Sequence, residues 1–299
     1  MNPLIISLLL FIALLSVSSS ALIVRYLTDL HALPIAFGRM LFAGMILWSY
    51  SLVKPQGSMS IPNRKRTLLA GIFLGFHFAL FFSAVKMTTL ANATLYGTLA
   101  PVFTVLIDRL FFNYAISRHV IMGLSCAIAG GMIIQETGIT FKSASFLGDM
   151  AAVFCSFWMA IVLLITKKAR NESGTIGYSR TVYITAAATL LFLCWIFAEP
   201  IRLPTNIEFV FLLILGFVPN ILGHSILYHS IKFLPSSTVA SVPLGEPVIV
   251  SLFGWFLFGE SVSMNVIIGG IIVLVGLAII IRNSKMDTDD EFSAVPAAE

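Results

Sequence analysis

Residues 242–260 read VPLGEPVIVSLFGWFLFGE, a run apolar enough for lipid that nevertheless carries Glu246 between Gly245 and Pro247. Such an acid could lie in a loop of a soluble protein or inside a bundle of membrane helices. The composition favours the second reading, because 58% of the 299 residues are hydrophobic and only 11% are charged. An ordinary globular domain has about 25% charged residues. With a mean hydropathy of +0.98, the chain is predicted to be an integral membrane protein.

The apolar residues fall into runs of the length that a membrane helix needs. A bilayer core of about 30 Å is crossed by about 20 mostly apolar residues, and long runs without alternation predict helices, not barrel strands. The ten predicted spans are residues 4–24, 33–53, 67–85, 91–111, 119–135, 146–166, 177–198, 207–229, 238–258 and 263–282. No basic residue precedes the first span, so a cleaved signal peptide is not expected. The predicted fold class is therefore all-α.

The distribution of lysine and arginine predicts the orientation, since cytoplasmic loops carry an excess of both. If both termini are cytoplasmic, 13 of the 18 basic residues lie inside and five lie outside. The five are Arg25, Arg39, Lys86, Lys142 and Arg202. We therefore expect a multi-pass protein of the cytoplasmic (inner) membrane with both termini in the cytoplasm. Residues 283–299 are polar and acidic and are expected to form a disordered cytoplasmic tail.

The run at 242–260 has a counterpart, LAPVFTVLIDRLFF, at residues 99–112. When the halves are compared without gaps, Lys86 is aligned with Lys232, Pro101 with Pro247, Gly123 with Gly269, and Gly130 with Gly276. The chain is thus predicted to hold two five-helix repeats, residues 1–140 and 146–282. Because five is odd, the repeats must have opposite orientations. Inverted repeats are typical of secondary transporters, whose substrate site lies near mid-membrane where the halves meet.

These runs, together with Arg39 in AFGRML, Arg180 in GYSRTV and the glycines of 269–276, resemble the ten-helix EamA-type branch of the drug/metabolite transporter superfamily. The resemblance covers residues 1–283. It implies two inverted five-helix repeats and transport of small metabolites, often amino-acid export. It also implies a central cavity lined by helices one, three and four with six, eight and nine.

The two halves differ at positions that bear on chemistry. Ala100 stands opposite Glu246 in the repeat alignment, and Tyr114 stands opposite Glu260. Any coupling that uses an acid would therefore come from the second half alone. Many relatives have a tryptophan in the first helix, where this chain has three serines at 18–20.

Glu246, His77 and His224 are the candidates for proton coupling. An acidic group at membrane depth is expensive and needs a partner or a task, and imidazole titrates near neutral pH. A structural carboxylate and packing histidines remain equally open. His229 lies five residues after His224 with no third ligand at a suitable spacing, so no metal site is expected.

Polar and aromatic side chains on the predicted spans are the candidates for substrate contact. They are His77, Tyr96, Trp158, Asn220, His224, Tyr228 and Ser241. Arg39 and Arg180 either bind a substrate carboxylate or extend to the lipid headgroups. Pro101 and Pro247 are predicted to kink their helices, and Pro219 beside Asn220 predicts either local unwinding or a simple kink. The three cysteines, Cys126, Cys155 and Cys194, are read as packing residues.

The sequence predicts a secondary active transporter that moves a small polar metabolite by alternating access. An amino acid or related amine is the expected substrate, and export is favoured. The alternatives are an uptake or exchange transporter for a nucleoside-like or vitamin solute, and a lipid flippase. We find no phosphate-binding loop and no nucleophile motif, so we expect no enzyme, no cofactor and no nucleic-acid partner. The expected partners are the substrate and the bilayer, with the protein as a monomer or homodimer.

Overall fold

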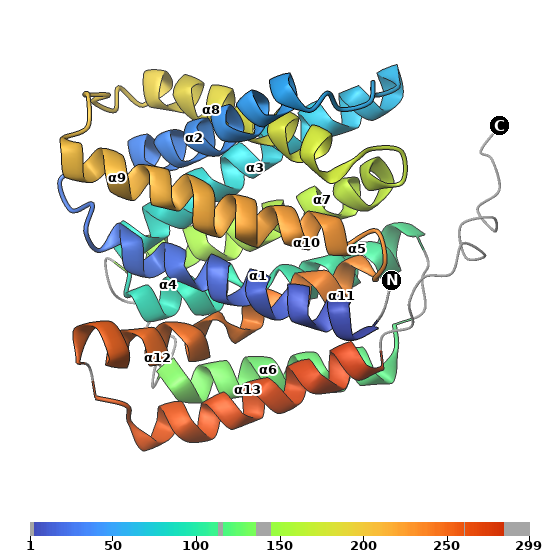
Figure 1. Cartoon of the computed structure of the whole chain (residues 1–299). Coiled ribbons are helices and arrows are strands. Elements are labelled where there is room, and N and C mark those ends of the chain that lie inside the picture. The colour runs from blue at the N-terminus through green and yellow to red at the C-terminus, as the bar shows by residue number, and fades with distance from the viewer. Residues whose placement is uncertain (1–2, 113–115, 136–144, 260, 284–299) are drawn as a thin grey trace.

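The computed structural model describes residues 3–112, 116–135, 145–259 and 261–283. Within these residues the regular structure is helical throughout, and the predicted all-α fold is confirmed (Figure 1). Tyr114, Glu260 and the predicted tail beyond Asn283 lie outside the described residues.

The helices of the first half match the predicted spans. They are α1 (Pro3–Val24), α2 (Ala32–Val53), α3 (Ile61–Met87), α4 (Leu90–Gly97), α5 (Ala100–Phe112) and α6 (Arg118–Gln135). Here α4 and α5 together make one candidate span, Asn92–Phe111. The apolar helix Arg118–Ile134 is shorter than the others.

The helices of the second half follow the same plan. They are α7 (Phe146–Arg170), α8 (Thr175–Ile196), α9 (Asn206–Leu215), a π-helix (Gly216–His224), α10 (Ser225–Ser230), α11 (Ser236–Ser241), a 3₁₀ helix (Val242–Gly245), α12 (Glu246–Phe258) and α13 (Met264–Arg282). In the described part of the chain, nine helical runs are long and apolar enough to cross a membrane, and the shorter helix of the first half is the tenth apolar segment.

Two spans are broken at equivalent places, and a proline follows each break. Pro101 lies in the first turn of α5, after the gap that separates it from α4. Pro247 lies in the first turn of α12, after the 3₁₀ helix. Proline has no N–H to donate and suits the first turn of a helix. Pro101 therefore begins a new helical segment after a gap, whereas Pro247 follows a 3₁₀ helix inside a run of helical backbone that extends from Ser236 to Phe258.

The glycines of α6 and α13 show that the last helices of the two halves run in opposite directions. A Cβ added to Gly123 would lie 2.7 Å from the carbonyl oxygen of Gly276, and one added to Gly130 would lie 2.6 Å from that of Gly269. The register falls along α13 as it rises along α6, so the helices are antiparallel. The repeat alignment exchanges these two contacts, as a two-fold relation between the halves requires. The two repeats are therefore inverted.

Other helix contacts repeat across the halves in the same way. The third span, α3, packs against α7, the first helix of the second half, and the π-helix of the eighth span packs against α1. Helices at the same position within each half also pack together: α2, the second span of the first half, contacts α8, the second span of the second half. The middle of the molecule is thus built from both halves.

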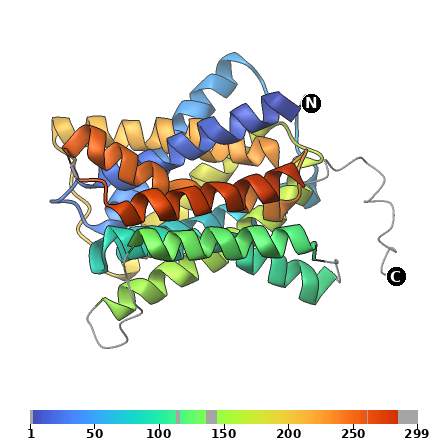
Figure 2. The same ribbon diagram turned by 90° about the horizontal axis from the view of Figure 1, so that it is seen from below.

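The start of α1 and the end of α13 lie at the same end of the bundle (Figures 1 and 2). We expect a fluorescent protein fused to either terminus to fluoresce in the cytoplasm, and a periplasmic reporter at either terminus to stay inactive. Reporters at the two termini that respond from opposite faces would contradict the even number of spans. Both termini on the outer face would contradict only the predicted orientation.

Candidate functional site

A pocket lies where the two halves meet. It is lined by Val17, Ser20, Arg39, His77, Phe78, Phe81, Gly97, Thr98, Ala100, Met159, Leu163, His224, Leu227, Val239, Ala240, Pro243 and Glu246. All six spans that the family resemblance implied contribute, and α2 adds one more lining residue, Arg39. The cavity volume is about 50 Å³, room for a few water molecules only. A larger solute therefore requires the walls to move apart.

Arg39 is a fully buried cation at the edge of this pocket, with 1% of its surface exposed. Its Nε donates to Oδ1 of Asn220 at 2.7 Å, and its Nη1 donates to Oγ of Ser20 at 2.7 Å. The guanidinium carbon lies 4.2 Å from the ring centre of Phe78 and 5.7 Å from that of Phe82, which adds cation–π stabilisation. These contacts hold the guanidinium in one orientation.

Asn220 reaches Arg39 because the eighth span widens into a π-helix there. The π-helix contains Pro219, which cannot donate a backbone hydrogen bond, and single π turns are often found at functional sites. The hydroxyl of Tyr183 donates to the carbonyl of Asn220 at 2.8 Å, and Nδ2 of Asn220 donates to the carbonyl of Arg39 at 3.2 Å. The predicted interruption is thus a π-helix that ties the second half to the first.

The two predicted histidines line the pocket from opposite halves. Nδ1 of His77 lies 2.9 Å from the carbonyl oxygen of Cys155, and because a carbonyl only accepts, Nδ1 carries the proton. Nδ1 of His224 is buried and has no hydrogen-bond partner among the described residues. The ring of His224 meets Phe78 edge-on, with 5.4 Å between ring centres.

Glu246 brings a carboxyl group to the same pocket. It is the first residue of α12, after the 3₁₀ helix, and its side chain is partly buried. The structure records no direct ion pair between Glu246 and Arg39, two described residues that both line the pocket. The lining therefore includes one carboxyl group and one guanidinium group.

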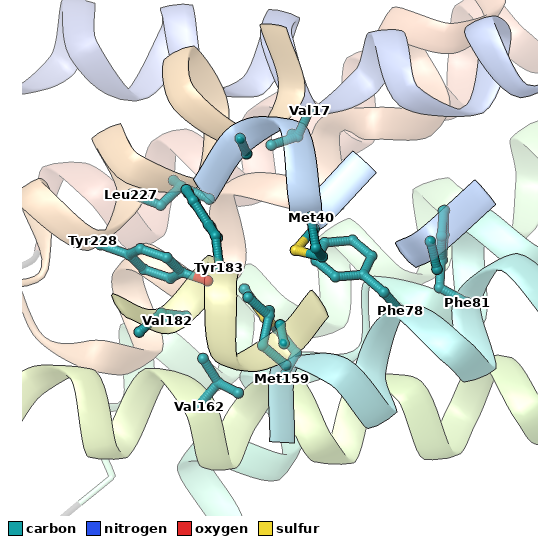
Figure 3. Close-up of a cluster of buried hydrophobic side chains, with 14 of the residues drawn as sticks. Val17, Met40, Phe78, Phe81, Met159, Val162, Val182, Tyr183, Leu227 and Tyr228 are labelled. Carbon is teal, nitrogen blue, oxygen red and sulfur yellow. The ribbon is translucent and has the colours of Figure 1, made fainter. Parts of the chain in front are cut away.

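Apart from Ser20 and Thr98, the rest of the wall is apolar, and the sequence did not predict it. Phe78 and Phe81 come from α3, Met159 from α7 and Leu227 from α10, and they belong to one hydrophobic cluster (Figure 3). Apolar residues are common on every span, so the sequence pattern cannot distinguish the apolar residues of the pocket from those that face lipid or the core. Phe78 alone had a feature that could have indicated its role, its position directly after His77.

Several predicted contact residues lie away from the pocket lining, each for a visible reason. The ring of Trp158 stacks on Phe73, with 5.0 Å between centres. Arg180 lies over the ring of Trp48 at 4.9 Å. Ser241 donates to a carbonyl of its own helix.

Two predicted tyrosines also lie beside the lining, not in it. Tyr96 precedes Gly97, which does line the pocket, and its carbonyl accepts a hydrogen bond from Ser156 at 2.6 Å. Tyr228 packs edge-on against Tyr178, 5.6 Å between centres. The structure thus gathers four predicted residues at the pocket: Arg39, His77, His224 and Glu246.

Within the described ranges, no three His, Cys, Asp or Glu side chains approach closely enough to hold a metal ion. Cys155 and Cys194 are buried, Cys126 is partly buried, and all three are free thiols.

Comparisons with known proteins agree with this architecture. The model of the EamA-like transporter family matches residues 4–135 and 146–282. The Pseudopaline exporter CntI of Pseudomonas aeruginosa is 24% identical over 269 residues, 89% of this chain and 92% of that protein. An uncharacterized transporter of Archaeoglobus fulgidus is 26% identical over 265 residues, 84% of this chain and 88% of that protein.

A solved crystal structure with 19% sequence identity superposes with a TM-score of 0.76 over 92% of this chain and 96% of its own. That likeness shows a shared fold. Because the family model covers most of the sequence in two consecutive matches, this chain belongs to the EamA-like transporter family.

Proposed function

We propose that this protein is a secondary active transporter that moves a small polar metabolite by alternating access, with an amino acid or related amine as the substrate. The observation that carries the proposal is the central pocket, which both inverted halves line and which holds Arg39 and Glu246. Inverted repeats give two related conformations around one fixed site, and a pocket lined by a guanidinium and a carboxyl group suits a solute that carries a carboxylate and an amine.

Export across the cytoplasmic membrane is the favoured direction. A relative that spans nearly the whole chain is named as an exporter. Glu246, His77 and His224 are the proposed proton-coupling groups, because they are the titratable acid and imidazoles of the lining. Uptake or release of a proton by Glu246 would change the charge beside Arg39, so proton and substrate occupancy would depend on each other.

A screen of the purified protein for thermal stabilisation tests the substrate class. We expect amino acids or their amines to raise the melting temperature, and the same compounds to exchange across proteoliposome membranes that contain the protein. Empty liposomes are the control for leakage. Stabilisation by nucleosides or vitamins in their place would support the uptake alternative, and stabilisation by lipids alone would support a flippase.

A further inference from the structure

Two nitrogen atoms of the pocket lining lack hydrogen-bond partners although both are buried. They are Nη2 of Arg39 and Nδ1 of His224. Their residues are 1% and 7% exposed. Buried polar atoms are nearly always paired in native proteins, and each exception calls for an explanation. Among the described residues, the other buried polar atoms without a partner belong to side chains outside the pocket lining. Arg39 and His224 line the same cavity.

Arg39 keeps N–H donors that no described residue accepts. Nε and Nη1 are already bonded to Asn220 and Ser20, so Nη2 is the free corner of the guanidinium. Because Nη2 only donates, its missing partner must be an acceptor. In a site of low polarity, a charged acceptor gains most from such a bond.

His224 completes the arrangement from the other half. Its ring and the guanidinium of Arg39 both contact Phe78, one edge-on and one over the ring face. In the tautomer with its proton on Nδ1, His224 offers a second donor into the same cavity. Two donors from two halves suit the two oxygens of one carboxylate.

We propose that Nη2 of Arg39 and Nδ1 of His224 form a subsite for a carboxylate of the transported metabolite. The inference rests on the proposed function and narrows it: a metabolite with a carboxylate is a substrate, and the same molecule without it is not. Because the Glu246 carboxyl group lines the same cavity, the substrate is expected to carry an amine that can bind Glu246 as well as the carboxylate.

Asn220 is then a positioning residue, since it touches Arg39 and not the pocket. It fixes Nε, and Ser20 fixes Nη1, so that Nη2 faces the cavity. A plain amine would leave both donors unpaired in a buried site. Sites built around a hydrogen-bonding group discriminate strongly against analogues that lack it.

The test uses matched pairs: leucine with 3-methylbutylamine, phenylalanine with 2-phenylethylamine, lysine with cadaverine, and histidine with histamine. Binding to the purified full-length protein is measured by thermal shift and calorimetry. In every pair that binds, we expect the amino acid to bind at least about 100-fold more tightly than its amine. An amine that binds as tightly as its amino acid overturns the subsite and leaves the transporter proposal standing. If no member of any pair binds, the proposed substrate class falls and the subsite falls with it.

Variants separate this role from a structural one. Asn220→Asp places a carboxylate against Nε of Arg39, and we expect it to lower amino-acid affinity at least about tenfold while amine affinity stays unchanged. A loss of folding would weaken both members of a pair alike, so the ratio is the readout. Asn63→Asp, at a buried asparagine outside the lining, is the matched control and should keep the wild-type ratio. A wild-type ratio in Asn220→Asp overturns the positioning role, and a wild-type ratio in His224→Phe overturns the second donor.

Discussion

The Glu246→Gln variant is expected to transport at a rate that no longer depends on pH, and at least about tenfold more slowly than the wild type. Glutamine has nearly the same shape as glutamate, but it neither carries a negative charge nor takes up a proton. Glu246 and Arg39 line the same pocket. Whenever Glu246 releases its proton, its charge offsets that of the buried guanidinium; glutamine cannot do this, and an unpaired charge at membrane depth is costly.

The measurement is uptake or exchange in proteoliposomes over a series of pH values, with the substrate found by the thermal screen. Glu172→Gln is the matched control, because that side chain is 50% exposed and lies on the loop between α7 and α8. It should keep the wild-type pH profile. If Glu246→Gln keeps that profile too, Glu246 is a structural carboxylate and the coupling proposal is wrong.

The architecture could be predicted from the sequence because each membrane-spanning helix needs about 20 consecutive, mostly apolar residues. Every predicted span corresponds to an apolar helix or to a consecutive pair or trio of helical segments. The opposite orientation of the two repeats followed from the number of spans. After five spans the chain is on the other side of the membrane, so the second repeat starts from the opposite face. The breaks before Pro101 and Pro247 were predicted as kinks, because a proline in a sequence does not show whether the helix before it continues.

The site was predictable only in part, and the reason is geometric. Charged and titratable groups inside apolar spans are rare, so Arg39, His77, His224 and Glu246 stood out and do line the pocket. Aromatic and hydroxyl side chains have no such selectivity. Trp158 stacks on Phe73 of α3, and Ser241 donates a hydrogen bond within its own helix. No sequence pattern shows whether such a side chain faces the pocket or a neighbouring helix. Ser20 and Asn220 act through Arg39, which requires the three-dimensional contact to recognise.

Gly269→Ala is expected to destabilise the protein, whereas Gly270→Ala one residue later is expected to be harmless. A Cβ on Gly269 would lie 2.5 Å from the carbonyl oxygen of Gly130 and 2.9 Å from the backbone nitrogen of Ile134. Backbone atoms cannot turn away as a side chain can, so α6 and α13 must separate. Inserting a methyl group into a packed core costs about 1–3 kcal/mol.

On Gly270, the nearest atom to an added Cβ is a methyl carbon of Val248 at 3.5 Å, an ordinary contact. Alanine is also the better helix former, so this variant should match or slightly exceed the wild-type melting temperature. Both variants are compared by thermal unfolding of the purified protein in detergent. Because both glycines are buried within α13, burial and helix propensity are nearly matched between them, and the close approach to α6 is the difference that is tested. Equal melting temperatures would mean that α6 and α13 do not cross at Gly130 and Gly269, and the antiparallel contact that relates the two halves would then be lost.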